Sequence, residues 1–267
     1  MVERKDEAPV ALITGAARRI GRHLAEALAT EGWNIVVHHR SSPEDAAETL
    51  GILEGIGGRH CIVQADLSIE AETRHLFEEA VQRMGRVDAV INNASLFEYD
   101  DADTFSCGSL LEHMLPNLGA PVVLAQALYR HIAQTRPVRT GVVLNLLDQK
   151  LGNPNPDFLS YTLSKSALKT ATTLLAKALA PHVRVVGLSP GLTLPSHLQT
   201  KQAFEEAHRL APLGQASTPT DIARAAVFLL QSPAITGVDL VVDGGQHLIG
   251  MERDFSMMEL EPARNPG

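Results

Sequence analysis

The stretch VALITGAARRIG at residues 10–21 decides the fold, because it joins an apolar run to a tight turn and then to a helical pattern. Val10–Ile13 is short and apolar, as a buried strand is. Gly15 permits the turn, and Gly21 permits the following helix to pack closely on the strand. Such a turn presents free amides and the positive end of a helix dipole to an anion. The stretch therefore predicts a βα unit that binds the pyrophosphate of a dinucleotide.

The same alternation of apolar runs and helical patterns continues along the chain. Short, nearly continuous apolar runs are typical of strands covered on both faces, and such strands form parallel sheets. The seven predicted strands are Val10–Ile13, Asn34–His38, His60–Ala65, Val87–Asn92, Gly141–Leu146, Val183–Leu188 and Val238–Val242. The six predicted helices are Ile20–Thr30, Glu44–Leu53, Ile69–Met84, Leu110–Ala133, Phe158–Leu179 and Thr220–Leu229. This order predicts an α/β fold, a doubly wound Rossmann-type parallel sheet in a single domain over residues 1–267.

Two regions depart from this rhythm. Residues 191–215 separate the sixth strand from the last helix and are rich in Pro, Leu, Thr and His. We expect this long segment to be irregular and to decide the substrate, because long loops in compact domains are often lids. Residues 251–267 carry both charges and two prolines, and we expect a poorly ordered end there.

Composition excludes several classes of protein. The chain of 267 residues is 45% hydrophobic with a formal net charge of −8, which argues against a disordered chain and against a general nucleic-acid binder. Cys61 and Cys107 form no CxxC pair, so neither a disulfide scaffold nor a cysteine zinc site is expected. The scattered histidines lack metal-ligand spacing, so no metal is expected. The absence of a membrane-helix window and of a signal-peptide core favours the cytoplasm, with no membrane partner.

The end of the second predicted strand indicates the cofactor. It runs into His39-Arg40-Ser41, with no carboxylate to bind the ribose diol of NAD. Arg19 stands where the turn of a dinucleotide fold usually has its second glycine. Arg40, Arg19 and Ser41 offer charged and neutral donors to a 2′-phosphate, so we expect NADP(H) as the cofactor. The alternative is that Arg40 is only a solvated charge at a strand end.

The third and fourth predicted strands also end in polar or small residues. Asp66 is a candidate acceptor for the adenine amino group, and alternatively a helix cap. The small Ala94 would let a cofactor pass close to the backbone. The candidate cofactor contacts at these two ends are Asp66, Leu67, Asn93, Ala94 and Ser95.

Tyr161 and Lys165 lie four residues apart in the fifth predicted helix, so they share one face. A tyrosine hydroxyl has an ordinary pKa of about 10. A nearby ammonium favours the phenolate and lowers that pKa. Together with the phosphate turn, the pair predicts a proton donor or acceptor that works near neutral pH.

The whole pattern resembles the short-chain dehydrogenase/reductase family over roughly residues 10–245. The matching pieces are Thr14–Gly21, Asp66-Leu67, Asn92–Ala94, Asn117, Tyr161-x-x-x-Lys165, Pro190-Gly191 and Thr236–Gly245. The resemblance implies hydride transfer to or from a nicotinamide, with Tyr161 exchanging the proton, Lys165 holding the ribose and Asn117 anchoring a water of a proton relay. It also implies a homotetramer built through paired helices. The cofactor contacts that it implies include Gly15, Arg19, Ile20, Tyr161, Lys165, Pro190 and Gly191.

One departure from the family pattern points to the substrate. The family normally places a serine thirteen residues before the tyrosine, where this chain has Asp148. An ionised carboxylate would oppose a developing alkoxide, but it suits a ring imine with basic nitrogens. Pteridine reductases, and the related bacterial dihydromonapterin and dihydrofolate reductases, are similar here: they carry this Asp, an Arg as at Arg19, a His-Arg-Ser run as at residues 39–41, and a stacking phenylalanine as at Phe97. The implied substrate contacts are Ser95, Phe97, Asp148 and Tyr161.

Three functions stay open at the level of sequence. The leading hypothesis is NADPH-dependent reduction of a C=N bond in a pterin-like heterocycle, namely a dihydropterin, dihydromonapterin or dihydrofolate. The second is a general carbonyl or 3-oxoacyl reductase, against which the missing serine counts. The third is a non-catalytic NADP-binding module, against which the Tyr161 and Lys165 pair counts. Likewise Phe97 is alternatively a packing residue, Asp148 a drifted position, and Ser95 a cap.

Overall fold

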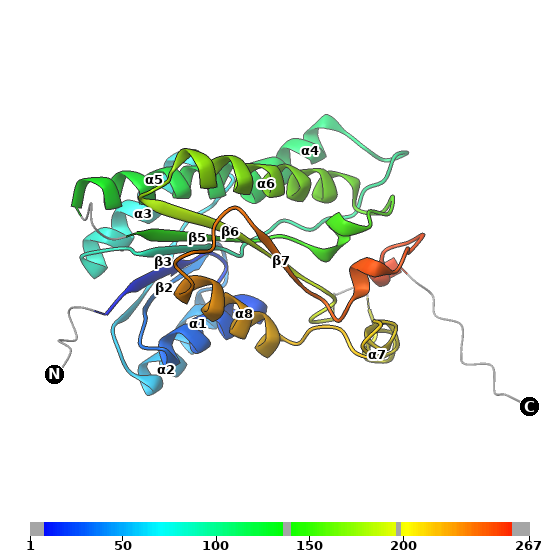
Figure 1. Ribbon diagram of the computed structural model, residues 1–267, viewed down its shortest axis with the longest axis horizontal. Helices are drawn as coiled ribbons and strands as arrows, with labels where there is room; N and C mark the ends of the chain where they lie inside the picture. Colours follow the sequence, from blue (N-terminus) through cyan, green and yellow to red (C-terminus); the bar gives the residue numbers. More distant parts are fainter. Residues whose placement is uncertain (1–7, 136–139, 196–198, 258–267) are drawn as a thin grey trace, which may run out of the picture.

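In the computed structural model, which describes residues 8–135, 140–195 and 199–257, one sheet lies between two layers of helices (Figure 1). All its strand pairs are parallel, in the order β3-β2-β1-β4-β5-β6-β7. The predicted seven-stranded, doubly wound sheet is therefore confirmed. The strands are β1 (Val10–Ile13), β2 (Asn34–His39), β3 (His60–Gln64), β4 (Ala89–Asn92), β5 (Gly141–Leu146), β6 (Val183–Pro190) and β7 (Asp239–Val242).

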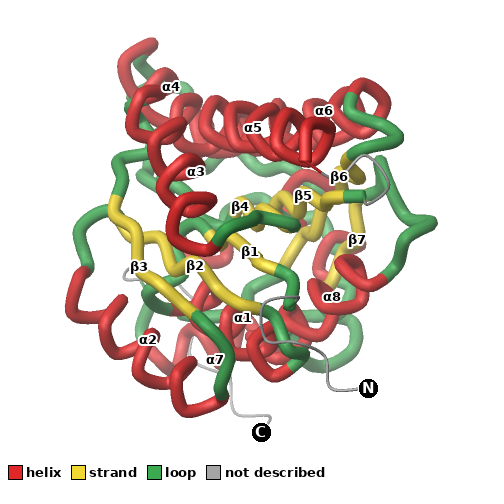
Figure 2. The backbone as a smooth tube through the Cα atoms, turned by 90° about the vertical axis from the view of Figure 1, so that its left-hand side faces the viewer, coloured by secondary structure: helices red, strands yellow, loops and turns green. Residues whose placement is uncertain are grey.

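Helices cover both faces of the sheet (Figure 2). One layer holds α1 (Arg19–Thr30), α2 (Pro43–Ile56) and α8 (Pro219–Gln231). The other holds α3 (Glu70–Met84), α4 (Cys107–Met114), α5 (Ala120–Thr135) and α6 (Leu159–Ala178). Successive residues of β1 pack into opposite layers, Ala11 and Ile13 with the first and Val10 and Leu12 with the second. This explains why the strand is apolar throughout. Within the described ranges, no helix is long and apolar enough to cross a membrane.

The predicted helix Leu110–Ala133 is interrupted. α4 ends at Met114, a π-helical turn spans Leu115–Gly119, and α5 begins at Ala120. In the π-turn the Ala120 N–H donates to the Leu115 carbonyl, five residues back. Pro116 lies at its start, and a proline has no N–H with which to continue an α-helical ladder. Such π-turns often mark functional sites, and this one contains the candidate residue Asn117.

The expectation that residues 191–215 are irregular is wrong in part. α7 spans Lys201–Arg209 inside this segment. Thr200 caps it, because its side chain accepts a hydrogen bond from Ala203 N. The good helix formers that follow Thr200 were the signal for this element.

The expectation of a poorly ordered end is also wrong where the tail is described. Residues 251–257 pack on the body of the protein, and Phe255 is buried. Arg253 Nε donates to Asp157 Oδ2 at 2.8 Å, and Asp254 N donates to the same oxygen at 2.7 Å. The buried carboxylate of Asp157 thus gives the segment a fixed attachment. Residues 258–267 lie outside the described part of the chain.

Candidate active site

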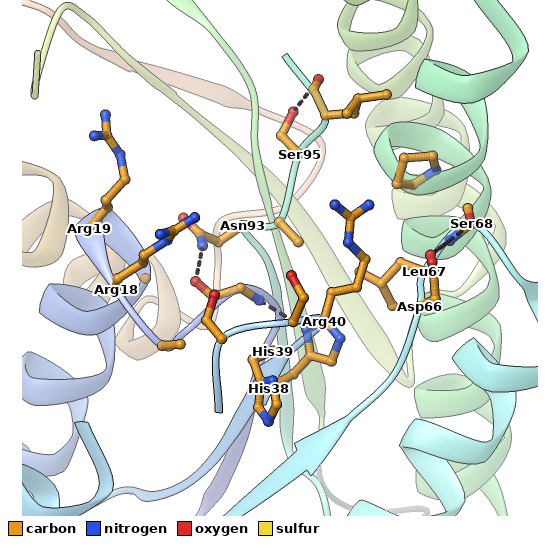
Figure 3. A pocket seen from close by; sticks show the side chains of 18 of the residues that line it. Arg18, Arg19, His38, His39, Arg40, Asp66, Leu67, Ser68, Asn93 and Ser95 are labelled. Atoms are coloured by element: carbon orange, nitrogen blue, oxygen red, sulfur yellow. Dashed lines mark hydrogen bonds between the residues drawn. The ribbon is translucent and has the colours of Figure 1, made fainter. Parts of the chain in front are cut away.

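A cavity of about 780 Å³ opens at the carboxyl ends of β1 to β4, where the order of strands reverses (Figure 3). Open α/β sheets bind ligands at such a switch point. Leu111, Glu112, Leu115 and Pro116, from α4 and the π-turn, form part of its wall. The structure brings most of the predicted cofactor residues into its lining, namely Gly15, Arg19, Ile20, His39, Arg40, Ser41, Asp66, Leu67, Asn93, Ala94 and Ser95.

The glycine turn is packed tightly against the end of β4. Gly15 has a φ of +63°, and a Cβ there would lie 3.1 Å from Ala94 Cα. A Cβ on Gly21 would collide with the Gly15 carbonyl. Asn93 Nδ2 donates to the carbonyls of Thr14 and Gly15, at 2.9 and 3.0 Å. Asn93 therefore fixes the turn from beneath, which leaves the amides at the start of α1 facing the cavity.

His38 ties this turn to its neighbouring strands, a role that was missed in the sequence. Gly15 N donates to His38 Nδ1 at 3.0 Å, so the ring proton resides on Nε2 and is donated to the Ala65 carbonyl at 3.0 Å. Burial lowers the pKa of His38 to about 4, so the ring is neutral and this tautomer is fixed. The only signal in the sequence was a second histidine in front of His39.

Arg19 and Arg40 both line this cavity, and their shared binding of a 2′-phosphate stays a prediction. Figure 3 shows Arg19 at the start of α1 and Arg40 after β2, with their side chains apart from each other. Arg19 Nη2 donates to the Pro195 carbonyl at 3.0 Å, in the segment that follows β6. Arg19 also has a φ of +55°, a left-handed conformation that explains why a glycine is usual here. Arg40 and Ser41 are exposed at the mouth of the cavity, where their donors are accessible to an anion.

Three other predicted contacts, at Asp66, Pro190 and Gly191, lie where the structure shows mainly structural roles. Asp66 Oδ1 accepts hydrogen bonds from Ser68 N and Oγ, at 2.9 and 2.7 Å, and these bonds lower the pKa of Asp66. Pro190 and Gly191 end β6 outside the lining of the large cavity. A Cβ on Gly191 would lie 2.5 Å from Gln246 Oε1, so this glycine is required by close packing.

Tyr161, Asp148 and Lys165 meet at the carboxyl end of β5. Tyr161 Oη donates to Asp148 Oδ2 at 2.7 Å. Lys165 Nζ donates to the Leu146 carbonyl at 2.7 Å and lies 5.8 Å from the centroid of the Tyr161 ring. Tyr161 and Lys165 are both buried on one face of α6, as their spacing predicts. Asp148 is delivered from the loop after β5, where its Oδ1 accepts from Lys150 N at 2.8 Å.

The charges of this cluster differ from expectation. Burial and the Asp148 carboxylate raise the pKa of Tyr161 well above its usual value, so the expected lowering by Lys165 is wrong here. The reason is that the hydroxyl bonds to the acid, while the ammonium bonds to a carbonyl. Burial also raises the pKa of Asp148 and lowers the pKa of Lys165 to about 8. Asp148 and Tyr161 therefore form a linked pair that favours holding protons, as a general acid does.

The Asn117 side chain connects the segment after β4 with α6. Its Oδ1 accepts from Leu96 N at 2.8 Å and from Ser95 Oγ at 3.2 Å. Its Nδ2 donates to the Leu96 carbonyl at 3.0 Å and to Ser164 Oγ at 2.9 Å. An asparagine amide has two donors and one oxygen with two lone pairs. The side-chain amide is therefore fully engaged within the protein, and the anchoring of a relay water by Asn117 stays a prediction.

Phe97 lies beside the cluster of Tyr161, Asp148 and Lys165. Its ring stacks on Phe158 at a centroid distance of 4.1 Å and an interplanar angle of 18°. It meets Tyr161 edge-on at 4.7 Å and 87°. Phe97 is half-buried, so the packing role is present, and stacking on a substrate stays a prediction.

The start of α6 depends on residues that sequence reasoning missed. Phe158 precedes the helix with a φ of +55° and is almost completely buried. Asp100, buried in the loop after β4, accepts hydrogen bonds from Ser160 N at 2.9 Å and from Ser160 Oγ. A phenylalanine in this conformation costs about 1–3 kcal/mol and persists only where its surroundings enforce it. The strain is located one helical turn before Tyr161.

No group of three or more His, Cys, Asp or Glu side chains gathers as a metal site in the part of the chain that the structure describes. Cys61 is half-buried and Cys107 is exposed, and both are free thiols.

Comparison with known proteins places the chain among oxidoreductases. Residues 15–247 match the family described as enoyl-(acyl carrier protein) reductase. The structure of FolM alternative dihydrofolate reductase 1 from Brucella canis, complexed with NADP, has a TM-score of 0.84 and 36% identity, covering 92% of this chain and 97% of that one. Pteridine reductase 1 of Leishmania tarentolae is 30% identical, covering 90% of this chain and 97% of its own. The 3-oxoacyl-(acyl-carrier-protein) reductase of Bos taurus is 33% identical, covering 90% and 98%.

These relatives are named for different substrates, yet each aligns over nearly the whole chain. The shared part includes the glycine turn at Gly15 and the helix that carries Tyr161 and Lys165. The chain belongs to the short-chain dehydrogenase/reductase family of oxidoreductases.

Proposed function

We propose that the protein is an NADPH-dependent reductase that adds hydride to a C=N bond of a pterin-like heterocycle, such as a dihydropterin, dihydromonapterin or dihydrofolate. The observation that carries this proposal is the 2.7 Å hydrogen bond from Tyr161 Oη to Asp148 Oδ2. A carboxyl group occupies the place where the family normally has a serine hydroxyl. That exchange favours a substrate whose nitrogen must be protonated over one whose carbonyl oxygen becomes negative.

The residues of the large cavity fit NADP(H). Its volume of about 780 Å³ is within the range of small-molecule and cofactor sites. Gly15 and Gly21 allow the close approach of a pyrophosphate to the backbone. Arg40 and Ser41 would hold the 2′-phosphate, in agreement with the NADP in the Brucella canis structure. Bound NADPH supplies the hydride.

The chain's own residues would supply the proton. Burial raises the pKa of Asp148, which favours its protonated form. The Tyr161 hydroxyl donates to Asp148, and the Tyr161 ring contacts Phe97 in a T-shaped arrangement. Tyr161 passes its proton to the ring nitrogen and regains one from Asp148. Lys165, charged below pH 8, stabilises the negative charge that remains on this pair.

Phe97 would orient the heterocycle. One face of its ring is covered by Phe158 and its edge touches Tyr161. A flat heterocycle stacked on the remaining surface would lie next to the proton donor. Stacking of this kind contributes about 0.5–1.5 kcal/mol beyond the burial of area. Ser95, exposed at the same end of the cavity, would contact both cofactor and substrate.

A general 3-oxoacyl reductase is the second candidate, because the bovine relative with that name is 33% identical. The two candidates make opposite predictions for Asp148→Ser, which restores the family's serine. The variant should lose activity on pterins if Asp148 is the proton source. It should gain activity on acyl thioesters if the carboxylate only obstructs carbonyl reduction.

The decisive experiment measures NADPH oxidation by the purified protein. We expect turnover with dihydrobiopterin, dihydromonapterin or dihydrofolate, and little with a 3-oxoacyl thioester. No oxidation with any of the three pterins would refute the proposal. Activity on the thioester alone would establish the second candidate, and tight NADPH binding without turnover on either class would point to a binding module.

We further propose that the protein is a homotetramer. Apolar side chains are exposed along α6: Leu163 is 44% exposed and Leu174 61%. Paired helices of two subunits would bury these side chains. Light scattering in solution tests the state, and a monomer alone would contradict it.

A further inference from the structure

A second polar cluster lies behind Asp148. Lys150, two residues further along the loop, is almost completely buried. Its Nζ donates to the Asp157 carbonyl at 2.6 Å and to Asp254 Oδ2 at 3.1 Å, and lies 5.3 Å from the centroid of the Phe158 ring. Burying an ammonium costs several kcal/mol unless it is paired. The partner that pairs it, Asp254, comes from the carboxyl-terminal segment 251–257.

Residues 251–257 contact two loops, the one that precedes α6 and the one that precedes α7. Asp254 N and Arg253 Nε both bond to the carboxylate of Asp157, just before α6. The next residue, Phe255, is buried, and its carbonyl accepts from Gln199 Nε2 at 3.0 Å. Gln199 precedes α7 in the segment expected to decide the substrate. Residues 251–257 therefore connect the loop that carries Asp148 with the loop that carries α7.

Three contacts run in line from this segment to the Tyr161 hydroxyl. Asp254 Oδ2 accepts from Lys150 Nζ at 3.1 Å. Lys150 N donates to Asp148 Oδ1 at 2.8 Å. Asp148 Oδ2 accepts from Tyr161 Oη at 2.7 Å. A side chain anchored at its far end fixes the backbone amide at its near end, and that amide determines which carboxyl oxygen of Asp148 faces Tyr161.

We propose that Lys150 and Asp254 are positioning residues: their buried ion pair holds the carboxyl-terminal segment against the active-site loop and thereby holds Asp148 in place at Tyr161. The functional meaning of this pair rests on the proposed proton donor, Asp148. Electrostatics supports the geometry, because the charge of Asp254 contributes to the raised pKa values of Asp148 and Tyr161. The groups that face Asp148 are Tyr161 and Lys165 from α6, Lys150 from its own loop, and Asp254.

The test compares Asp254→Asn and Lys150→Met with a matched control. Asp254→Asn removes one charge and keeps the shape of the side chain. The control, Lys169→Met, breaks another Lys–Asp ion pair, the 2.9 Å contact with Asp239, on the same helix as Tyr161. Two quantities are measured in the full chain: kcat with NADPH and a dihydropterin against pH, and the titration of the Asp148 carboxyl by ¹³C NMR, assigned with Asp148→Asn.

We expect Asp254→Asn to move the Asp148 titration, and the falling limb of kcat, to lower pH. Lys150→Met keeps the backbone N–H that bonds to Asp148 and removes the side-chain anchor behind it. We expect it to lower kcat about tenfold, as much as weakening one hydrogen bond of the proton donor would, with KM for NADPH unchanged. Lys169→Met should leave both quantities as in the wild type. If Asp254→Asn and Lys150→Met lower the Tm alone, and leave kcat and the titration of Asp148 unchanged, the pair is only structural and the inference is overturned. If the Asp148 titration moves but the protein does not turn over any pterin, the positioning role stands and the proposed function is refuted. Failure of the inference and failure of the proposed function are therefore distinguishable.

Discussion

Replacing Asp148 with asparagine removes a titratable proton from the active site and keeps the shape of the side chain. Asn Oδ1 can still accept the Tyr161 hydroxyl, which now lies 2.7 Å from Asp148 Oδ2. What is lost is the proton that Asp148 would pass to Tyr161, and with it the charge-assisted hydrogen bond that the resulting carboxylate would form with the Tyr161 hydroxyl. Hydrogen bonds to charged groups are worth about 1.5–3 kcal/mol. With about 1.4 kcal/mol for each factor of ten in rate, we expect kcat to fall about 10- to 150-fold.

The pKa of Asp148 also predicts how activity and stability change with pH. Burial raises the pKa of Asp148 in the folded protein, so the proton donor is present at low pH and is lost as the pH rises through that pKa. The native state also keeps this proton longer than the unfolded chain does, so the group lowers stability as the pH rises through the same window. Asparagine cannot ionise, and therefore Asp148→Asn should have a Tm equal to or above that of the wild type at pH 8.

The assay is NADPH oxidation with a saturating dihydropterin from acid to alkaline pH, together with thermal unfolding of both proteins. The reasoning is wrong if the asparagine variant retains kcat within about twofold of the wild type. The reasoning is also wrong if kcat of the variant still falls with rising pH in the range assigned to Asp148. A large drop in Tm together with the loss of activity would show that Asp148 holds the structure and does not supply the proton.

Three further predictions concern the cofactor, the substrate and the lysine. Arg40→Ala should raise KM for NADPH about 10- to 100-fold and leave KM for NADH nearly unchanged, because only the first has a 2′-phosphate; equal changes for both would contradict the assignment. Phe97→Leu should raise KM for the pterin about 2- to 10-fold at an unchanged KM for NADPH, since it removes stacking and retains apolar area. Lys165, with a pKa of about 8, should produce a second fall in kcat as the pH rises through 8. Lys165→Arg, which stays charged, should abolish that fall, and its persistence would assign it to another group.

The strands and most of the helices were predictable from the sequence. β1 to β7 and most helices follow from apolar periodicity, because a strand covered on both faces has to be apolar throughout. The π-turn at Leu115–Gly119 was not predictable, because the sequence pattern around Asn117 is that of one long helix. The hydrogen bonds of the Asn117 side chain with Leu96 and Ser164 exist only in the folded structure. α7 was missed because helical composition in a segment rich in loop residues is a weak signal.

The same division holds within the candidate site. Tyr161 and Lys165 could be placed together because four residues of one helix return to the same face. Asp148 could be identified as a departure from the family pattern. Its contact with Tyr161, however, joins a loop to a helix, and no local rule places a loop carboxylate 2.7 Å from a hydroxyl. The raised pKa of Tyr161, where sequence reasoning expects a lowered one, follows from that contact.

The sequence by itself determined the parallel sheet, the glycine turn and the residue types that meet at its carboxyl end, because these depend on periodicity and on short-range steric limits. The contacts between those residues come from the tertiary structure. It pairs Arg19 with the Pro195 carbonyl, bonds the side-chain amide of Asn117 to Leu96, and brings Asp254 from the far end of the chain to Lys150. Burial and hydrogen bonding between distant segments set the charges of a site, and a linear sequence does not carry those distances.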